Sequence, residues 1–540
     1  MVEQERTPSP RSRKRRRSLW LLVTVVSLGA VVGASGIVAE RFIRHELDAA
    51  ASRLCATVDP QAPPTVYVSL LQRTVRITGL AFVPLAECSG EEFVLRGHLD
   101  TLEVSGVSLL DLVFTNTISV DRLLARAHAL QCITRAAKGI SNTQKEAEAY
   151  TIEIGSFDIR LASAHSERED DDTLSLEVRD IAITGNNLHF ILGKEGSDTD
   201  LHCEQLKLLV DSFDLLSTTG YAAAFDHCMV DQEQGTLDLF CLSAGPTLGL
   251  EAHSATMRFE GDVYQARLDT VNARGLDVER LLAQRNCSAR SVFVTSGDIA
   301  ILRDKTLPDG PDPVKLLLAR VVRGFSSGSG ADTVVLRGVD ITYQERGSRS
   351  RGFALIPFSA VNGTITGVRN NASDTAQLAI NAECVAFGTA PVRLAFTTAI
   401  NDTTDRFNVS AWIGALPFNA LNTATVPLAN IRATEGVMDS LIFEMHADDR
   451  NAHGTVRMTY AGLKLDSGWK RDSDLMQDVK TALLNTLVRD KNNERDGVAK
   501  PGKYTLARHR NRSVFNYLWS GLREGVKAVL LPQAVSGQEQ

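Results

Sequence analysis

A period-two alternation of apolar and polar residues constrains the fold of this 540-residue chain more than any other feature. Runs such as Val66–Leu70, Val75–Leu80 and Leu174–Val178 alternate in this way, and glycine, asparagine and aspartate stand at the breaks between runs. Because successive side chains of a β-strand point to opposite faces, the pattern predicts many short antiparallel or coiled strands, each with one apolar and one polar face. The pattern persists from residue 57 to residue 465, so the chain is expected to be mainly β.

An internal repeat links two of the predicted strands. Residues 151–161 align with residues 333–343 without a gap, at an offset of 182 residues, and the offset continues to Ile183 and Ile365. A repeated strand–turn–strand unit is typical of a structure that grows by stacking, in which each unit buries its apolar face against the next. Chance similarity between strand-rich segments is the alternative. The first matched apolar pairs are Ile152 with Val334 and Ile154 with Leu336, and a related pair of turn sequences is Gly106–Ser108 and Gly275–Asp277.

The N-terminal sequence predicts a membrane anchor. Leu19–Ala39 is a run of 21 residues without a charged side chain, and a helix of that length spans about 30 Å, the thickness of the hydrocarbon core of a bilayer. Residues 1–18 hold seven Arg or Lys and two Glu, a net charge of +5. This excess indicates a basic tail that stays in the cytoplasm while the chain after the helix is exported. A cleaved signal peptide, with Val32–Ala34 before the cleavage site, is the main alternative, and a buried core helix is a third.

Helices are predicted on both sides of the β-rich part. Residues 40–56 show a helical spacing of apolar residues and are expected to form a short juxtamembrane helix. The β-rich part divides into a first repeat region, residues 57–270, and a second, residues 271–468. Residues 469–540 are expected to form a helical cap of two helices, the second of which starts near Ser513.

The second C-terminal helix carries an apolar stripe beside basic residues. Two interpretations of this stripe are open. A basic amphipathic helix can lie on an anionic membrane surface, whereas a repeat protein needs a terminal cap that packs its apolar face on the sheet. The candidate residues of the stripe are Phe515, Leu518, Trp519, Leu522 and Val526, continued by Val529.

Composition and charge exclude several classes of protein. With 44% hydrophobic and 23% charged residues, the chain is too apolar for disorder and too charged for a membrane protein with many spans. The net charge of -7 is unevenly spread, because residues 1–18 and residues 470–540 each carry +5, which leaves -17 between them. A nucleic-acid-binding protein needs a basic face for phosphate, so no nucleic-acid partner is expected.

Eight cysteines follow the predicted anchor, where an oxidising compartment would permit disulfides. Their spacing contains no C-x-x-C pair, so neither a zinc site nor a thioredoxin-like motif is supported. Cys228 and Cys241 flank a possible turn at Gln232–Gly235 and could pair across a hairpin. Separate buried thiols are the alternative.

The short motifs of the chain do not form a catalytic or metal-binding pattern. Gly324–Gly328 matches G-x-S-x-G, but a hydrolase needs a strand before this motif and a helix after it, and here a strand is predicted to follow. His446 and His453 could meet on neighbouring strands, although ordinary surface histidines are the simpler explanation. The sequence contains no H-E-x-x-H motif and no phosphate-binding glycine–lysine motif. We therefore expect no enzyme activity, no catalytic residue, no cofactor and no metal.

Several segments, taken in order, resemble the bacterial AsmA-like family of envelope proteins, most closely its Bacteroidetes-type members. These segments are Gly275–Leu282, Ile301–Pro308, Ile341–Arg346 and Arg512–Trp519, and the resemblance extends loosely from residue 19 to residue 531. It implies an anchor in the inner membrane and a periplasmic part built as an elongated, curved antiparallel β-sheet with an apolar, groove-like concave face. It also implies a link to phospholipid movement or outer-membrane homeostasis. The chain is short for a member that would bridge the whole periplasm.

These features together predict a lipid-handling protein, single-pass in the bacterial inner membrane, with a cytoplasmic N-terminus and a periplasmic bulk. Its partners would be phospholipid or another acyl lipid, the inner membrane and outer-membrane components. An apolar groove binds acyl chains without specific polar contacts, because each buried CH₂ contributes about 0.8 kcal/mol. The alternative function is a periplasmic assembly or scaffold factor that binds outer-membrane protein precursors along its edge strands. Candidate groove-lining residues are Ile152, Ile154, Val334 and Leu336, although the alternation does not decide which strand face lines the groove.

Overall fold

The structure, a computed structural model, confirms that the protein is mainly β. Its strands belong to one large mixed sheet of 23 strands, which forms a β-solenoid. The chain divides into two compact units, Met1–Cys241 with Arg274–Cys287, and Leu242–Ala273 with Ser288–Gln540. The residues that the structure describes are Leu47, Ala51, 56–69, 72–84, 93–108, 117–134, 150–168, 171–192, 201–284, 286–310, 314–347, 352–370, 376–467, 491–492 and 499–530.

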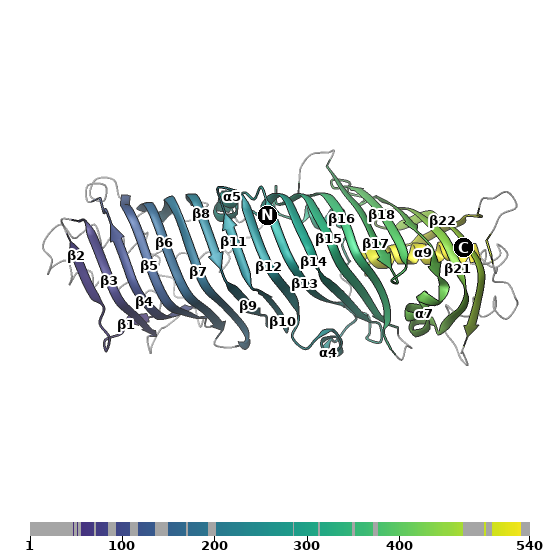
Figure 1. Ribbon diagram of the computed structural model, residues 1–540, viewed down its shortest axis with the longest axis horizontal. Coiled ribbons are helices and arrows are strands. Elements are labelled where there is room, and N and C mark those ends of the chain that lie inside the picture. The colour runs from purple at the N-terminus through teal and green to yellow at the C-terminus, as the bar shows by residue number, and fades with distance from the viewer. Residues whose placement is uncertain are drawn as a thin grey trace, which may run out of the picture. The chain divides into compact units, whose positions relative to one another are not determined.

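The first unit is built from strands that pair mainly with their neighbours in sequence. Its elements are β1 (Ala56–Val58), β2 (Thr65–Ser69), β3 (Thr74–Pro84), β4 (Phe93–Ser105), β5 (Thr117–Thr134), β6 (Tyr150–Arg168), β7 (Asp171–Leu192), β8 (His202–Val210), β9 (Ser212–Leu216), β10 (Tyr221–Phe225), β11 (His227–Asp231), α5 (Val278–Gln284) and the first part of β12 (Thr236–Pro246). From β3 to β8 each strand pairs with the next one. Figure 1 shows these strands side by side, coloured from purple to teal.

The second unit continues the same arrangement and adds most of the helices. Its elements are α4 (Leu250–Thr256), β13 (Asp262–Arg274), β14 (Ser288–Asp304), α6 (Leu318–Arg323), β15 (Gly330–Arg346), β16 (Ala354–Arg369), β17 (Gln377–Ala386), β18 (Ala390–Ala399), β19 (Phe407–Ile413), β20 (Leu416–Pro417), the 3₁₀ helix η2 (Phe418–Leu421), α7 (Asn422–Ala429), β21 (Ile431–Ala447), β22 (Asn451–Ser467), β23 (Gly502–Ala507) and α9 (Val514–Leu530). Strands β14 to β19 pair in sequence order, and β21, β22 and β23 extend the series after β19.

Among the strand pairs whose register the structure describes, β5–β6 and β14–β15 are parallel, which corrects the expectation of an antiparallel sheet. β5 and β6 run in parallel, with Thr117 beside Thr151, and β14 and β15 run in parallel, with Ser288 beside Gly330. β6 and β15 are the two strands that the internal repeat aligns, and each then pairs with an antiparallel strand, β7 or β16. The sequence alone did not reveal the parallel pairs, because parallel and antiparallel strands share the same two-residue period.

The turns that precede the parallel pairs also match. β4 and β13 each end immediately before a glycine with positive φ, Gly106 at 72° and Gly275 at 65°. The next residue is buried in both cases, with exposed fractions of 3% for Val107 and 6% for Leu276. Glycine adopts this left-handed conformation without the steric cost of a β-carbon. The repeat in the sequence therefore corresponds to a repeated structural unit.

The apolar face of the first unit is covered near its N-terminal strands. Ile152 and Ile154 of β6 are 0% and 1% exposed and belong to a core that also includes apolar residues of β3, β4 and β5. Leu47 and Ala51, both helical, are buried in the same core. These two residues lie within residues 40–56, where the sequence predicts a helix, and their four-residue spacing places them on one side of a helix.

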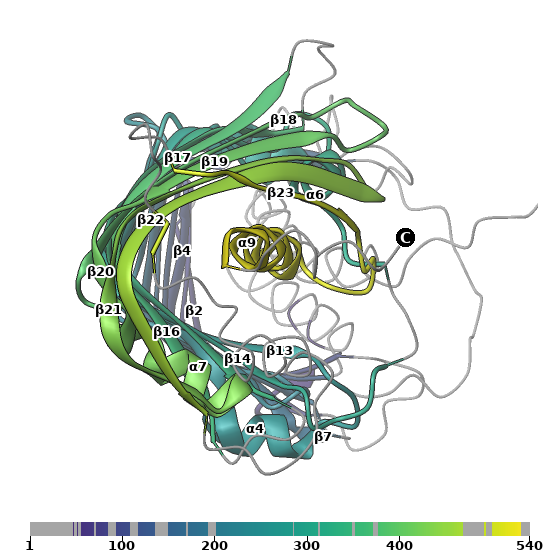
Figure 2. The same ribbon diagram turned by 90° about the vertical axis from the view of Figure 1, so that its right-hand side faces the viewer.

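In the second unit, α9 covers the apolar face. The sheet of this unit curves around the helix, which lies on the concave side (Figure 2). The buried residues of α9 are Tyr517, Gly521, Gly525 and Val529, and the helix contacts β21, β22 and β23. A β-carbon at Gly525 would collide with the side chain of Val456, so glycine lets the helix backbone approach the sheet closely.

The buried stripe of α9 differs from the stripe that the sequence predicts. Phe515 and Trp519 are 36% and 39% exposed, whereas Leu518, Leu522 and Val526 are partly buried against the core. The prediction followed the large apolar side chains. In the structure, small residues determine which side of the helix lies closest to the sheet, because a glycine allows the shortest approach.

Several predicted segments lie outside the described residues. These are the basic tail (1–18), the apolar run (19–39) and the first helix predicted within residues 469–540. Within the part of the chain that the structure describes, no helix has the length and apolarity to cross a bilayer.

Candidate functional site

Two rows of apolar side chains cross the concave face of the second unit. Residues directly opposite on neighbouring strands place their side chains on the same face, so the strand register defines each row. The first row, from β14 to β21, is Val292, Val334, Ile365, Ile380, Phe396, Val409 and Met445. The second is Val294, Leu336, Gly363, Ala382, Leu394, Ala411 and Phe443.

Burial decreases along both rows. Near α9, Phe396, Val409 and Met445 are 3%, 4% and 0% exposed. At the other end of the rows, Val334 and Leu336 are only half-buried. The helix that covers the buried end contacts β21, β22 and β23. Each row therefore passes from a closed core to an apolar surface that solvent reaches.

The four predicted groove residues fall into two pairs. Val334 and Leu336 lie on the accessible part of the apolar rows, whereas Ile152 and Ile154 lie beneath packed side chains in the first unit. The structure therefore does not place Ile152 and Ile154 on an open surface. A half-buried apolar row does exist farther along the first unit, and it consists of Ala125, Ile159, Ile183, Leu208 and Val230.

A buried ion-pair network holds the start of α9. Glu260 accepts hydrogen bonds from Arg512 and from Arg303, the latter with 2.5 Å between Nε and Oε1. Arg303 also donates to Asp262 over 3.0 Å, and Arg512 to Asp309 over 2.8 Å. Burial alone would raise the pKa of Glu260, but the hydrogen bonds from Arg512 and Arg303 outweigh it and lower this pKa to about 2. Both guanidinium groups therefore face an ionised carboxylate.

Phe515, at the start of α9, rests on Tyr343 of β15. The centroids of the two rings lie 4.9 Å apart. Tyr343 lies beside Ile301 and opposite Ile356 in the strand register, so this contact belongs to the apolar face. The Tyr343 hydroxyl donates a hydrogen bond to Glu345 over 2.8 Å, and burial raises the pKa of Tyr343 above its ordinary value. The network and the ring contact together fix the start of α9 beside β14 and β15.

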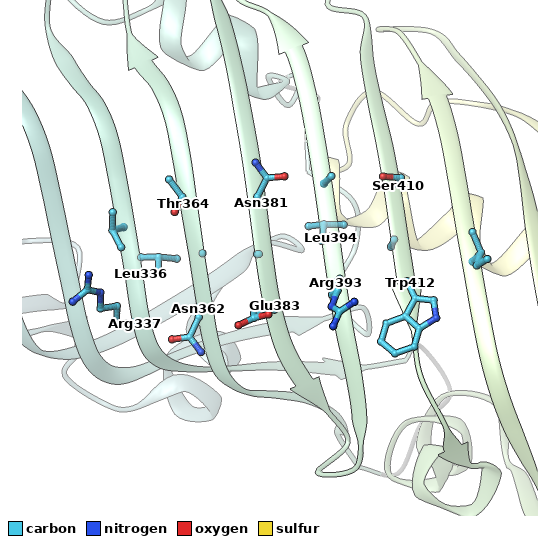
Figure 3. Close-up of a pocket in the computed structure, with 16 residues that line it drawn as sticks. Leu336, Arg337, Asn362, Thr364, Asn381, Glu383, Arg393, Leu394, Ser410 and Trp412 are labelled. Atoms are coloured by element: carbon cyan, nitrogen blue, oxygen red, sulfur yellow. The ribbon is translucent and has the colours of Figure 1, made fainter.

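The opposite, polar face of the second unit carries an open groove of about 820 Å³. It crosses β15 to β19 and reaches Ile442 of β21. Its floor is the backbone of residues such as Leu336 and Leu394, whose side chains belong to the apolar rows. Two lines of side chains border the groove. One line is Arg337, Asn362, Glu383, Arg393 and Trp412, and the other contains Thr364, Asn381 and Ser410 (Figure 3). The strand register adds Val335 and Ala395 to the second line.

The most distinctive part of this polar-face groove is a stacked pair. The guanidinium carbon of Arg393 lies 5.3 Å from the ring centroid of Trp412. Arg393 lies directly opposite Glu383 on β17 and directly opposite Trp412 on β19. Directly opposed charges elsewhere in this unit do pair, as Lys464 and Glu435 do at 2.6 Å. Glu383, by contrast, makes no side-chain hydrogen bond or ion pair to any other residue that the structure describes.

The G-x-S-x-G sequence lacks the local geometry of a hydrolase motif, and the two histidines lie on neighbouring strands. Gly324–Gly328 lies between α6 and β15, so the strand–turn–helix geometry of a hydrolase nucleophile is not formed there. His446 and His453 do meet, directly opposite each other with ring centroids 5.5 Å apart, and His446 contacts Asn408 at 2.7 Å. The described ranges contain no group of three or more metal-binding side chains.

The disulfide between Cys228 and Cys241 that the sequence allows is not formed. Neither cysteine forms a disulfide, and Cys228 is buried whereas Cys241 is exposed. Cys228 lies opposite Leu239 in the β11–β12 hairpin, which places Cys241 two positions beyond the facing residue. The hairpin was correctly located, but its register was not readable from the spacing alone.

No family model matches the chain, and no curated protein shows a significant match to it. Sequence reasoning missed the polar-face groove. Glu383, Arg393 and Trp412 each stand at a polar-face position of an alternating strand, but only the strand register shows that they are neighbours.

Proposed function

We propose that this protein handles or transfers phospholipid, or another acyl lipid, on its apolar face and so supports outer-membrane homeostasis. The observation that carries the proposal is the decrease of burial along the two apolar rows, from Met445 under α9 to Val334 and Leu336. A half-buried strip of aliphatic side chains suits an acyl chain, since each CH₂ taken from water contributes about 0.8 kcal/mol and no specific polar contact is needed.

The dimensions of the strip agree with such a ligand. The half-buried part of the first apolar row extends from Val292 of β14 to Ile380 of β17. At the usual separation of neighbouring strands this part is about 14 Å long. The hydrocarbon layer of one leaflet of a bilayer is about 15 Å thick. One acyl chain laid across these four strands would therefore find an apolar surface along most of its length.

The proposed setting is the envelope of a bacterial cell. The apolar run Leu19–Ala39 and the basic residues before it support an inner-membrane anchor with a cytoplasmic N-terminus. The resemblance to the AsmA-like family supports the same location and the same lipid-related role. Membrane fractionation, followed by protease treatment of spheroplasts, tests this proposal, because only a periplasmic bulk would be degraded from outside.

Photo-crosslinking combined with lipid mass spectrometry tests the lipid proposal directly. The full chain would be purified in mild detergent with a photoreactive phenylalanine analogue at Leu336, and a matched variant would carry the analogue at Val335, the next residue on the opposite face. We expect stoichiometric phospholipid in the purified protein and crosslinks to lipid from position 336 that exceed those from position 335 by about tenfold, the ratio that 1.4 kcal/mol of preference produces.

A lipid-free protein, or equal crosslinking from the two positions, would contradict the proposal. Enrichment of unfolded outer-membrane protein precursors instead of lipid would favour the alternative, an assembly or scaffold factor that works through edge strands. The two outcomes are distinguishable because crosslinked lipid and crosslinked protein differ in mass by more than tenfold.

A further inference from the structure

We propose that the polar-face groove, bordered by Arg393 and Trp412, binds an extended oligosaccharide. This site would be separate from the lipid strip, because the two lie on opposite faces of the same strands. Leu336 and Leu394 show the separation: their side chains belong to the apolar rows, while their backbones form the floor of the groove. Neither binding site requires the other to be occupied.

The geometry of the groove suits a linear chain that lies across the strands. Each strand from β15 to β19 contributes one side chain to each border, so possible contacts recur about every 4.8 Å, the separation of neighbouring strands. This interval is close to the spacing of successive sugars in a β-linked glycan. The two borders are two residues apart along each strand, or about 6.8 Å between backbones, so the groove admits no more than a single chain.

The chemistry of the borders suits a sugar. Ile442, which is 38% exposed, and the part of the Trp412 ring that Arg393 does not cover offer apolar surface to the C–H faces of pyranose rings. The side chains of Thr364, Asn381 and Ser410 make no hydrogen bond to any other described residue, so their donors and acceptors are available to hydroxyl or acetamido groups.

The stacked pair also leaves two charged groups available for hydrogen bonding. Arg393 lies over Trp412 instead of pairing with Glu383, its direct neighbour on β17. A guanidinium that stacks on an aromatic ring keeps its N–H donors directed outward in its own plane. Glu383 offers acceptors and Arg393 offers donors on adjacent strands, an arrangement that matches vicinal hydroxyl groups.

Other ligand classes fit the groove less well. A peptide strand binds by adding to a free edge, but the backbone beneath the groove is already paired on both sides with neighbouring strands. An acyl chain would lie against charged side chains at a cost in desolvation. A single-stranded nucleic acid needs a groove that is strongly positive, whereas Glu383 lies at the centre of this border.

Isothermal titration of the full chain with defined glycans tests the proposal. The probes are chitopentaose and cellopentaose, with N-acetylglucosamine and glucose as the matched single sugars. We expect at least one pentasaccharide to bind in the micromolar to millimolar range and to bind at least about tenfold more tightly than its single sugar, since several strands contribute contacts. Trp412→Ala should weaken binding by about tenfold or more, the ratio that the loss of one aromatic contact produces.

Two further variants separate the groove from general effects on folding. Ala395→Arg places a long side chain in the groove and should abolish pentasaccharide binding while the apolar core stays intact. Trp519→Ala removes an exposed tryptophan of α9, on the other side of the sheet, and should leave the affinity within about twofold. The proposal is overturned if neither pentasaccharide binds at millimolar concentration. It is equally overturned if Ala395→Arg binds as the wild-type chain does.

Discussion

In the first unit, Ile154 is 1% exposed within a sealed core, whereas its repeat partner in the second unit, Leu336, is half-buried on a surface that solvent reaches. Both residues lie on the second strand of a parallel pair and occupy the same place in the alternating pattern. The difference lies in what packs over them. Leu47 and Ala51 join the core around Ile154, while α9 packs mainly on β21, β22 and β23, at the far end of the row that contains Leu336. The strand pattern thus defines an apolar face, and the covering element decides whether that face becomes a core or a binding surface.

The strongest test of this comparison introduces a charge at each of the two positions. Ile154→Asp would bury a carboxylate among apolar side chains, and we expect it to lower the free energy of unfolding by about 4 kcal/mol or more. Leu336→Asp would leave its carboxylate in contact with water and should cost about 1 kcal/mol or less. Urea unfolding, followed by intrinsic fluorescence and circular dichroism, measures both changes. Similar losses for the two variants would show that the apolar strip is covered after all.

Low pH should weaken the packing of α9 against the sheet of the second unit. The pKa of Glu260 is lowered from 4.5 to about 2 in the folded protein, so the stability that this group contributes is present above pH 4.5 and is lost as the pH falls toward 2. The loss should reach about 3 kcal/mol. Hydrogen exchange of the α9 amides between pH 6 and pH 2, corrected for the intrinsic exchange rate, measures the opening.

Glu260→Gln provides the corresponding variant. It removes the carboxylate that Arg303 and Arg512 share and leaves each with one anionic partner, Asp262 or Asp309, so α9 should exchange faster at pH 6 than in the wild-type chain. Glu435→Gln is the control, because it removes the carboxylate from an exposed ion pair in which the side chains of Glu435 and Lys464 are 59% and 65% exposed. It should change the free energy of unfolding by less than about 0.5 kcal/mol. If α9 stayed protected in Glu260→Gln, the network would not be what holds the helix.

Replacing Gly525 of α9 with a larger residue should expose more of the two apolar rows to solvent. Gly525→Leu forces the helix away from Val456, at a cost of about 1–3 kcal/mol for overpacking. The higher helix propensity of leucine offsets up to about 1 kcal/mol of this cost, so the free energy of unfolding should fall by about 1–2 kcal/mol. Lipid crosslinking from the buried end of the rows should increase in this variant. Ser520→Ala, at a partly exposed position of the same helix, is the control and should change neither quantity.

The smallest effect is expected at the repeated turns. Gly275→Ala places a β-carbon on a residue with φ of 65° and should cost about 1 kcal/mol. Gly106→Ala should cost more, since its β-carbon would also collide with the side chain of Asp121. Thermal unfolding of the two variants resolves this difference. Equal costs would indicate that the first turn adjusts its backbone as readily as the second.

The sequence was sufficient to predict the strands but not what packs on them. Alternation located the β-rich part, and the offset of 182 residues linked β6 with β15, which the structure places in equivalent parallel pairs. Burial of Ile152 and Ile154 could not be predicted, because their partners Leu47 and Ala51 lie about a hundred residues away in the chain. The predicted stripe of α9 includes Leu518, Leu522 and Val526, which pack against the core, but it does not include Gly521 and Gly525, which the structure buries against the sheet.

The candidate sites show the same division. Val334 and Leu336 were predicted from one-dimensional periodicity, which identifies a face of each strand. The stacking of Arg393 on Trp412 depends on the register between β18 and β19, and a shift of one residue would move either side chain to the opposite face. Register is set by turns and packing, so a site assembled across strands remains hidden until the sheet is known.

The two parallel pairs have a consequence for the time course of folding. Antiparallel hairpins form between adjacent segments and close quickly, whereas a parallel pair must first bring together strands separated by a crossover connection. Contacts between β5 and β6, and between β14 and β15, are therefore the ones expected to form last. The antiparallel hairpins would therefore form first as separate blocks, and the two parallel pairs would join these blocks in a later and slower step.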